Sequence, residues 1–124
     1  MKQLIAIAVG GAVGAVLRYG VSNAVYSLMG RGFPYGTLVV NVAGSLLMGL
    51  LFVILIERSA FDVLWRSALL IGCLGAFTTF STFSIETLNL MENGSLGLAI
   101  LNMILSVVLC MIAVWLGVVL ARQI

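Results

Sequence analysis

Long apolar runs, separated by short polar segments, set the pattern of this chain. The runs cover, in chain order, residues 3–29, 36–56, 63–91 and 96–121. The separators are the turn-like segments 30–34 and 92–95 and the charged segment 57–62. Each run is at least as long as the roughly 20 residues that a helix needs to cross a bilayer. The pattern predicts an all-α integral membrane protein with four transmembrane helices in one domain, residues 1–124.

The composition argues for a membrane protein and against a soluble one. The chain has 124 residues, of which 63% are hydrophobic and 8% are charged. A soluble domain of this length cannot bury so much apolar surface. Cys73 and Cys110 lie inside the apolar runs, so we expect small buried side chains rather than a disulfide or a metal pair. Small residues such as Gly10, Gly14 and Gly49 predict close contacts between helices.

The basic residues give a weak signal for orientation. An even number of spans places both termini on one side of the membrane, together with Lys2, Arg58, Arg66 and Arg122. Arg31, and with it Arg18, fall on the other side. The excess favours termini in the cytoplasm, but it is small enough that insertion in both orientations stays open.

The most unusual segment lies in the middle of the third run, where residues 78–84 read TTFSTFS. Water is absent from the bilayer core, so a polar break there must face protein or a water-filled path. Phe80 and Phe83 are three residues apart and share a helical face. The edge of an aromatic ring is positive and hydroxyl groups donate hydrogen bonds, so the segment suits a small anion without a basic residue. Binding without a full charge lets the ion leave, as conduction requires.

Other polar residues in the apolar runs are candidates for function, because such residues are costly in a membrane. Asn41 lies early in the second run, and Asn102, Ser106 and Cys110 recur every four residues on one face of the fourth. That face either lines a wet path or forms hydrogen bonds between helices. Glu86 needs a partner, a wet crevice or a proton. Arg18 either attracts anions at a vestibule or snorkels to the interface.

Three motifs together resemble one family along the whole chain. They are the glycine pair Gly10-Gly11 leading to Leu17-Arg18, the segment GTLVVNVAG at 36–44, and the long segment GCLGAFTTFSTFSIE at 72–86. With these residues the chain resembles the CrcB/Fluc fluoride channels. Relatives often carry a glycine and an aliphatic residue where Ala76 and Phe77 stand here.

The resemblance implies a fluoride-selective channel in the bacterial inner membrane. Such channels are antiparallel homodimers of four-helix subunits, inserted with dual topology, with a third helix broken at its centre and two fluoride pores. Their function is detoxification. Hydrogen fluoride enters cells as a neutral weak acid, ionises inside, and leaves passively as fluoride through the channel.

The resemblance also implies roles for particular residues. Phe80 and Phe83 present ring edges to fluoride, Asn41 faces the ion path, and Arg18 lies in a vestibule. The polar track along the pore contains Ser81, Thr82, Asn102 and Ser106. A structural sodium ion at the dimer centre is held by the main-chain carbonyls of Gly75 and Thr78, as suits a hard cation.

Two other classes of function compete with a channel. A small dual-topology drug exporter is also built from four short helices, but it needs a carboxylate deep in the bundle, and Glu86 is the only intramembrane acid here. A structural subunit predicts no ion flux and leaves the segment 78–84 without a purpose. An enzyme fits least, because the sequence has no nucleophile with a base, no metal cluster and no phosphate-binding loop, and nothing in it suggests a nucleic-acid partner.

Overall fold

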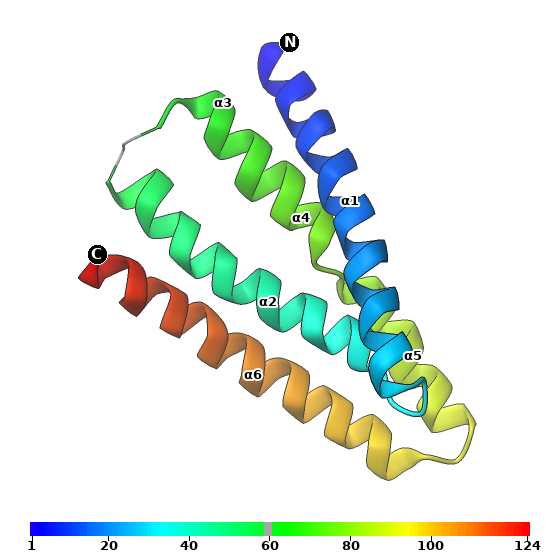
Figure 1. The fold of residues 1–124 in the computed structure, drawn as a ribbon. Helices are drawn as coiled ribbons and strands as arrows, with labels where there is room; N and C mark the ends of the chain where they lie inside the picture. The colour runs from blue at the N-terminus through cyan, green and yellow to red at the C-terminus, as the bar shows by residue number, and fades with distance from the viewer. Residues whose placement is uncertain (59–60) are drawn as a thin grey trace.

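The computed structural model describes residues 1–58 and 61–124, and these residues form a bundle of helices (Figure 1). The elements are α1 (Lys2–Met29), α2 (Tyr35–Phe52), η1 (Val53–Glu57), α3 (Val63–Arg66), η2 (Ser67–Leu74), α4 (Gly75–Phe77), α5 (Phe80–Glu92) and α6 (Leu96–Gln123), where η1 and η2 are π-helical turns that continue their neighbours. Gly30 and Gly94 have φ angles of 82° and 80°, which glycine adopts without strain, and they mark the two tight turns predicted from the sequence.

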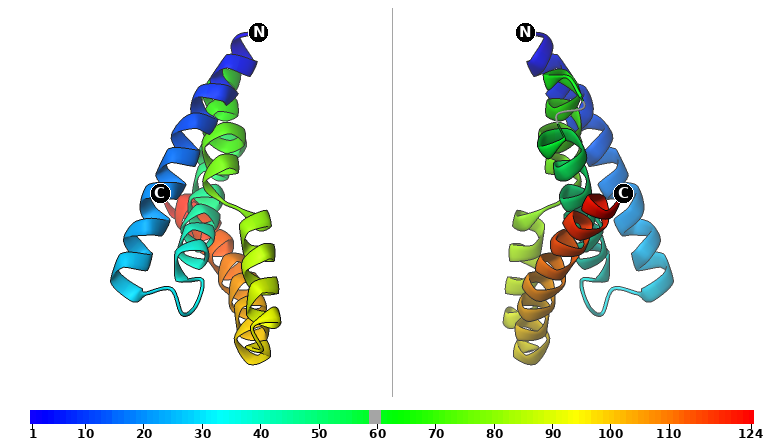
Figure 2. Two further views of the ribbon diagram at one scale, coloured as in Figure 1. Left: turned by 90° about the vertical axis from the view of Figure 1, so that its right-hand side faces the viewer. Right: turned by 90° about the vertical axis from the view of Figure 1, so that its left-hand side faces the viewer.

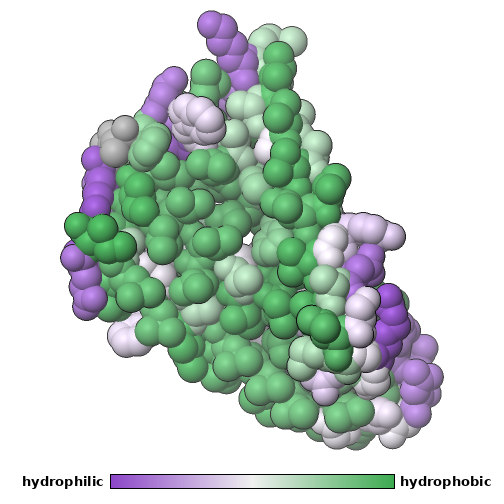
Figure 3. All heavy atoms as spheres, viewed as in Figure 1, coloured by the Kyte–Doolittle hydropathy of each residue, from purple (hydrophilic) through white to green (hydrophobic). Residues whose placement is uncertain are grey.

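Four helical segments are long and apolar enough to cross a membrane. They are Lys2–Met29, Tyr35–Glu57, Val63–Glu92 and Leu96–Gln123. The four predicted spans are therefore confirmed, with bounds that differ by no more than two residues. Figure 3 shows hydrophilic side chains along the edge near the link between η1 and α3 and over α5, with an apolar surface between them. This distribution fits a chain whose middle lies in lipid.

Two helix pairs form the frame of the fold. In Figures 1 and 2, α2 and α6 lie side by side, while α1 packs along η2 and α4. Glycines make both contacts possible. A Cβ added at Gly10 or Gly14 would overlap the backbone of η2, and one added at Gly49 or Gly117 would overlap the backbone of the facing helix of the α2–α6 pair. The close packing predicted from small residues is thus confirmed.

The third span changes its backbone conformation at two residues. Thr78 has φ −81° and ψ 157°, and Thr79 has φ −151° and ψ 119°, so both are extended. Helix α5 begins at Phe80, because the Thr79 side chain caps it by accepting a hydrogen bond from the backbone N–H of Thr82 at 3.1 Å. The non-helical stretch is therefore shorter than the polar segment 78–84, and Phe80 and Phe83 stand on the first turn of a capped helix.

Candidate functional site

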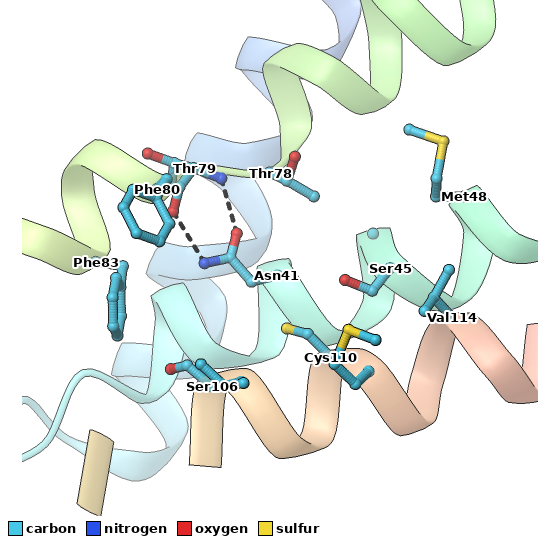
Figure 4. A pocket seen from close by; sticks show the side chains of 13 residues that line it. Asn41, Ser45, Met48, Thr78, Thr79, Phe80, Phe83, Ser106, Cys110 and Val114 are labelled. Carbon is cyan, nitrogen blue, oxygen red and sulfur yellow. Dashed lines mark hydrogen bonds between the residues drawn. The ribbon is translucent and has the colours of Figure 1, made fainter. Parts of the chain in front are cut away.

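Asn41 of α2 fixes the extended residues from the side. Its Oδ1 accepts the backbone N–H of Thr79 at 2.7 Å, and its Nδ2 donates to the Thr79 carbonyl at 2.9 Å (Figure 4). In an unbroken α-helix the Thr79 N–H would bond with the carbonyl of Gly75. Asn41 thus replaces a helical partner, and its amide is committed to the backbone of this segment.

Hydroxyl groups gather around the same point. The Thr79 hydroxyl lies 3.0 Å from that of Thr82 and 3.4 Å from that of Ser81, and Thr78 donates to the Leu74 carbonyl at 3.0 Å. Thr79 is buried, whereas Ser81 is exposed on the surface of the single chain. The segment is therefore a short polar centre inside an apolar bundle.

A cavity of 470 Å³ lies between this centre, α2 and α6, and we call it the phenylalanine cavity (Figure 4). It is lined by Asn41, Gly44, Ser45, Met48, Thr78, Thr79, Phe80, Phe83, Ser106, Val107, Cys110, Met111 and Val114. None of these described residues carries a charge. Any ion in this cavity would meet ring edges, hydroxyls and an amide, without a counter-charge from its walls.

The two phenylalanines form one aromatic pair at the wall of this cavity. Their ring centroids are 5.4 Å apart and the rings are tilted by 45°. Phe80 is 79% exposed in the single chain, and Phe83 is partly buried. The tilt and the exposure leave ring edges of the pair accessible, and such edges are the electropositive part of an aromatic ring.

The polar face of α6 divides into two environments. Ser106 and Cys110 line the phenylalanine cavity. Asn102, one turn away, is 2% exposed, donates to the Thr87 hydroxyl at 2.9 Å and accepts from Ser106 at 3.4 Å. Asn102 does not line the phenylalanine cavity. Asn102 therefore forms a hydrogen bond between helices, whereas Ser106 lines a cavity.

A second cavity, of 380 Å³, lies on the other side of Thr79 between α1, α2 and α5, and we call it the arginine cavity. Its polar lining consists of Arg18, Tyr19, Ser22, Tyr26, Thr37, Thr79, Thr82 and Glu86. The predicted site residues are therefore not all in one place. Arg18 and Thr82 face this second cavity, and Thr79 alone borders both.

Glu86 has the partners that its position demands. One carboxylate oxygen accepts from the Thr37 hydroxyl at 2.7 Å, and the other accepts from the Tyr26 hydroxyl at 3.3 Å. Sequence reasoning missed Tyr26 and Thr37. Thr37 lies four residues before Asn41 and thus on the same face of α2, which is the signal that points to it.

The backbone near Gly75 and Thr78 suits a hard cation. Gly75 is exposed on the single chain, and the N–H that would satisfy its carbonyl in a helix is taken by Asn41. Among residues 1–58 and 61–124, no group of three or more histidine, cysteine or acidic side chains is placed to hold a metal. Carbonyl oxygens are therefore the donors that this region offers to a cation such as sodium.

The chain matches known proteins along almost its whole length. The family model described as CrcB-like protein, Camphor Resistance (CrcB), matches residues 5–118. A protein of Methylococcus capsulatus named fluoride-specific ion channel FluC is 60% identical over 121 residues, covering 98% of this chain but 53% of that protein. Proteins with the same name from Coxiella burnetii and Geobacter sulfurreducens are 56% and 49% identical, and there the alignment covers 98% and 99% of both chains.

Proposed function

The chain belongs to the CrcB-like family, and from this premise we propose that it is a fluoride-selective ion channel, not an enzyme, that releases fluoride from the cytoplasm. The relatives that match its whole length are named fluoride-specific ion channels. The single structural observation that supports this function best is the phenylalanine cavity. It offers ring edges and hydroxyl groups to an anion, and none of its described lining residues carries a charge.

Fluoride would cross this cavity by exchanging weak partners. The edges of Phe80 and Phe83 would face the ion with partial positive charge. The hydroxyls of Ser106 and Thr78, which donate to Asn102 and to the Leu74 carbonyl in the structure, would turn to donate to the ion as it passes. A fixed cation would hold a small anion too tightly, whereas conduction needs a site that the ion leaves readily. Thr82 and Ser81, next to the Thr79 hydroxyl, continue the polar track.

Export would be passive. The negative-inside potential acts on an anion with about 2.3 kcal/mol per charge per 100 mV. Fluoride that enters as neutral acid and ionises in the cytoplasm is thus driven out without a coupling ion. This role places the protein in the inner membrane of a bacterial cell.

Two copies would pair in opposite orientations. The charge bias is small, with Lys2, Arg58, Arg66 and Arg122 at the end that holds the termini and Arg31 at the other. Antiparallel pairing would bring the exposed Gly75 and the half-buried Thr78 of both copies to one two-fold axis in the membrane plane. In intact cells, an impermeant thiol reagent should label only part of a population that carries one added cysteine beside Asn93, in a chain without Cys73 and Cys110. Labelling of every copy from one side would rule out this arrangement.

A sodium ion would bind on that axis. The Gly75 carbonyl lacks its helical donor because Asn41 takes the Thr79 N–H, and the extended Thr78 follows the end of α4. Sodium binds such carbonyl oxygens without a carboxylate. The ion would be structural, since it would join the two copies at the centre of the membrane.

The function is tested with purified protein in liposomes loaded with fluoride. We expect rapid fluoride efflux, far slower chloride efflux, and no dependence on a proton gradient. Efflux that requires a proton gradient would favour the drug-exporter class, in which Glu86 is the coupling carboxylate. No efflux of either ion from folded protein would favour a structural subunit.

A further inference from the structure

A third cavity, of 280 Å³, opens at the end of the bundle that carries the loop between α1 and α2. Its polar lining is Tyr26, Arg31, Glu86, Asn89 and Asn93. It shares Tyr26 and Glu86 with the arginine cavity, which in turn reaches Thr79. The three cavities thus form a series from the loop to the extended segment.

Arg31 lies at this mouth, stacked on Tyr26 and carried by a loop that Phe33 anchors. Its guanidinium carbon lies 4.7 Å from the centroid of the Tyr26 ring, a cation–π contact. The loop itself is anchored by Phe33, which is 7% exposed and packs with its ring 5.2 Å from that of Tyr35. Arg31 is exposed, and its contact with Tyr26 places the guanidinium beside the opening.

The charge of Arg31 is not neutralised by a carboxylate in the described part of the chain, where the salt bridge found is that of Arg122 with Glu57. Glu86 lines the inner end of the same cavity, but both of its oxygens accept hydrogen bonds from hydroxyl groups. These bonds leave the negative charge of Glu86 in place, so the cavity holds charge of both signs, with Glu86 at the inner end and Arg31 as the cation at the outer end. The amides of Asn89 and Asn93 supply hydrogen-bond donors in the same cavity.

We propose that this cavity is an antechamber in which Arg31, stacked on Tyr26, collects the permeating anion from water before the ion enters the arginine cavity. The proposal rests on the proposed channel function. A positive charge in a cleft raises the local concentration of an anion and the rate of its entry. Arg31 would therefore set how fast ions arrive, whereas the uncharged phenylalanine cavity sets which ions pass.

The test measures fluoride flux into liposomes at low fluoride concentration for the wild type and Arg31→Gln. At low ionic strength Arg31→Gln should reduce the flux by about threefold, the size expected for one charge several ångströms from an ion in a wet cleft. The difference should vanish at about 1 M of an inert salt, where the Debye length is about 3 Å. The ratio of fluoride to chloride flux should stay unchanged at both salt concentrations.

Lys2→Gln is the matched control, because it removes the same charge from the first turn of α1, outside the three cavities. It should behave as the wild type. Equal flux in Arg31→Gln and the wild type at low salt would overturn the proposal, and so would a loss that persists at high salt. Absence of fluoride-selective flux in the wild type would instead overturn the channel function itself.

A second variant keeps the test independent of folding. Arg31→Cys, in a chain without Cys73 and Cys110, is purified and then modified with a cationic or an anionic thiol reagent of similar size. The cationic adduct should restore low-salt flux and the anionic adduct should lower it further. The same flux with both adducts would contradict a role for charge at this mouth.

Discussion

The phenylalanine cavity and the arginine cavity meet at Thr79 but differ in their chemistry. The first is lined by two rings, four hydroxyl-bearing residues, an amide and otherwise apolar groups, and none of its described lining residues is charged. The second contains Arg18 and Glu86 among tyrosine, serine and threonine hydroxyls. One polar residue thus separates a place without fixed charge from a place with charge of both signs.

The difference between the two cavities indicates that a small channel gathers ions at one site and lets them pass at another. Charge at a wet entrance gathers ions, but the same charge in the dry centre would hold them strongly, because the attraction is large where water is scarce. The centre needs the opposite property, a weak contact made by many partial charges.

Replacing Asn41 with aspartate should abolish fluoride flux. Asn41→Asp loses the amide that donates to the Thr79 carbonyl and places a carboxylate at the uncharged cavity. We expect a loss of about 100-fold, since a barrier higher by ~2.7 kcal/mol slows passage by that factor. Asn23→Asp makes the same chemical change on α1 outside the three cavities and should keep its flux. Wild-type flux in Asn41→Asp at neutral pH would show that the centre tolerates charge.

Replacing either ring with an aliphatic side chain should remove most of the flux. Phe80→Ile and Phe83→Ile keep apolar bulk but lose the positive ring edge, and we expect a decrease of about tenfold or more. Liposome efflux measures the loss, and size-exclusion chromatography of each purified variant beside the wild type shows whether its assembly state is unchanged. Phe52→Ile, on α2 outside the cavities, is the control. Unchanged flux in both ring variants would mean that the rings merely pack.

Removing sodium should inactivate the channel slowly. Prolonged exchange into a large organic cation leaves the Gly75 and Thr78 carbonyls without their ion, so we expect most of the flux to disappear and to return with sodium. Loss of sodium should not change the lining of the arginine cavity, because Gly75 and Thr78 are not part of it. Full activity after verified removal of sodium would count against a required cation.

Two neighbours on α6 should respond differently. Ser106→Ala removes a hydroxyl from the phenylalanine cavity and should lower flux by about threefold, as expected for one modest hydrogen bond of under 1 kcal/mol. Asn102→Ala removes the hydrogen bond to Thr87 and should lower the free energy of unfolding by roughly 0.6 kcal/mol, the average for such bonds in membranes. The flux of this variant should be nearly unchanged. The reverse pattern would place the ion path along Asn102.

Much of the fold followed from local features of the sequence. Apolar runs and their separators set the four spans, and Gly30 and Gly94 set the turns. The spacing of Phe80 and Phe83 predicted a shared face, and their rings are neighbours. These features depend on residues close in sequence, for which the period of a helix determines which side chains share a face.

The division into two cavities did not follow from the sequence, because it depends on contacts between distant elements. Asn41 bonds to Thr79 and Glu86 bonds to Tyr26 across 38 and 60 positions of the chain. The periodicity of the sequence assigns each residue to a face of its own helix. It does not determine which other helix packs against that face. Thr82 was therefore predicted on one polar track with Ser106, while the structure places Thr82 at the arginine cavity and Ser106 at the phenylalanine cavity.

The central claim is that fluoride rests at the edges of the Phe80 and Phe83 rings and not on an arginine. Solid-state NMR of the protein in bilayers tests it by transfer of magnetisation from bound ¹⁹F fluoride to ¹³C-labelled side chains. With labelled phenylalanine we predict transfer to ring carbons that is lost in Phe80→Ile, and with labelled arginine we predict weaker transfer. Strong transfer to arginine together with none to phenylalanine would contradict the account.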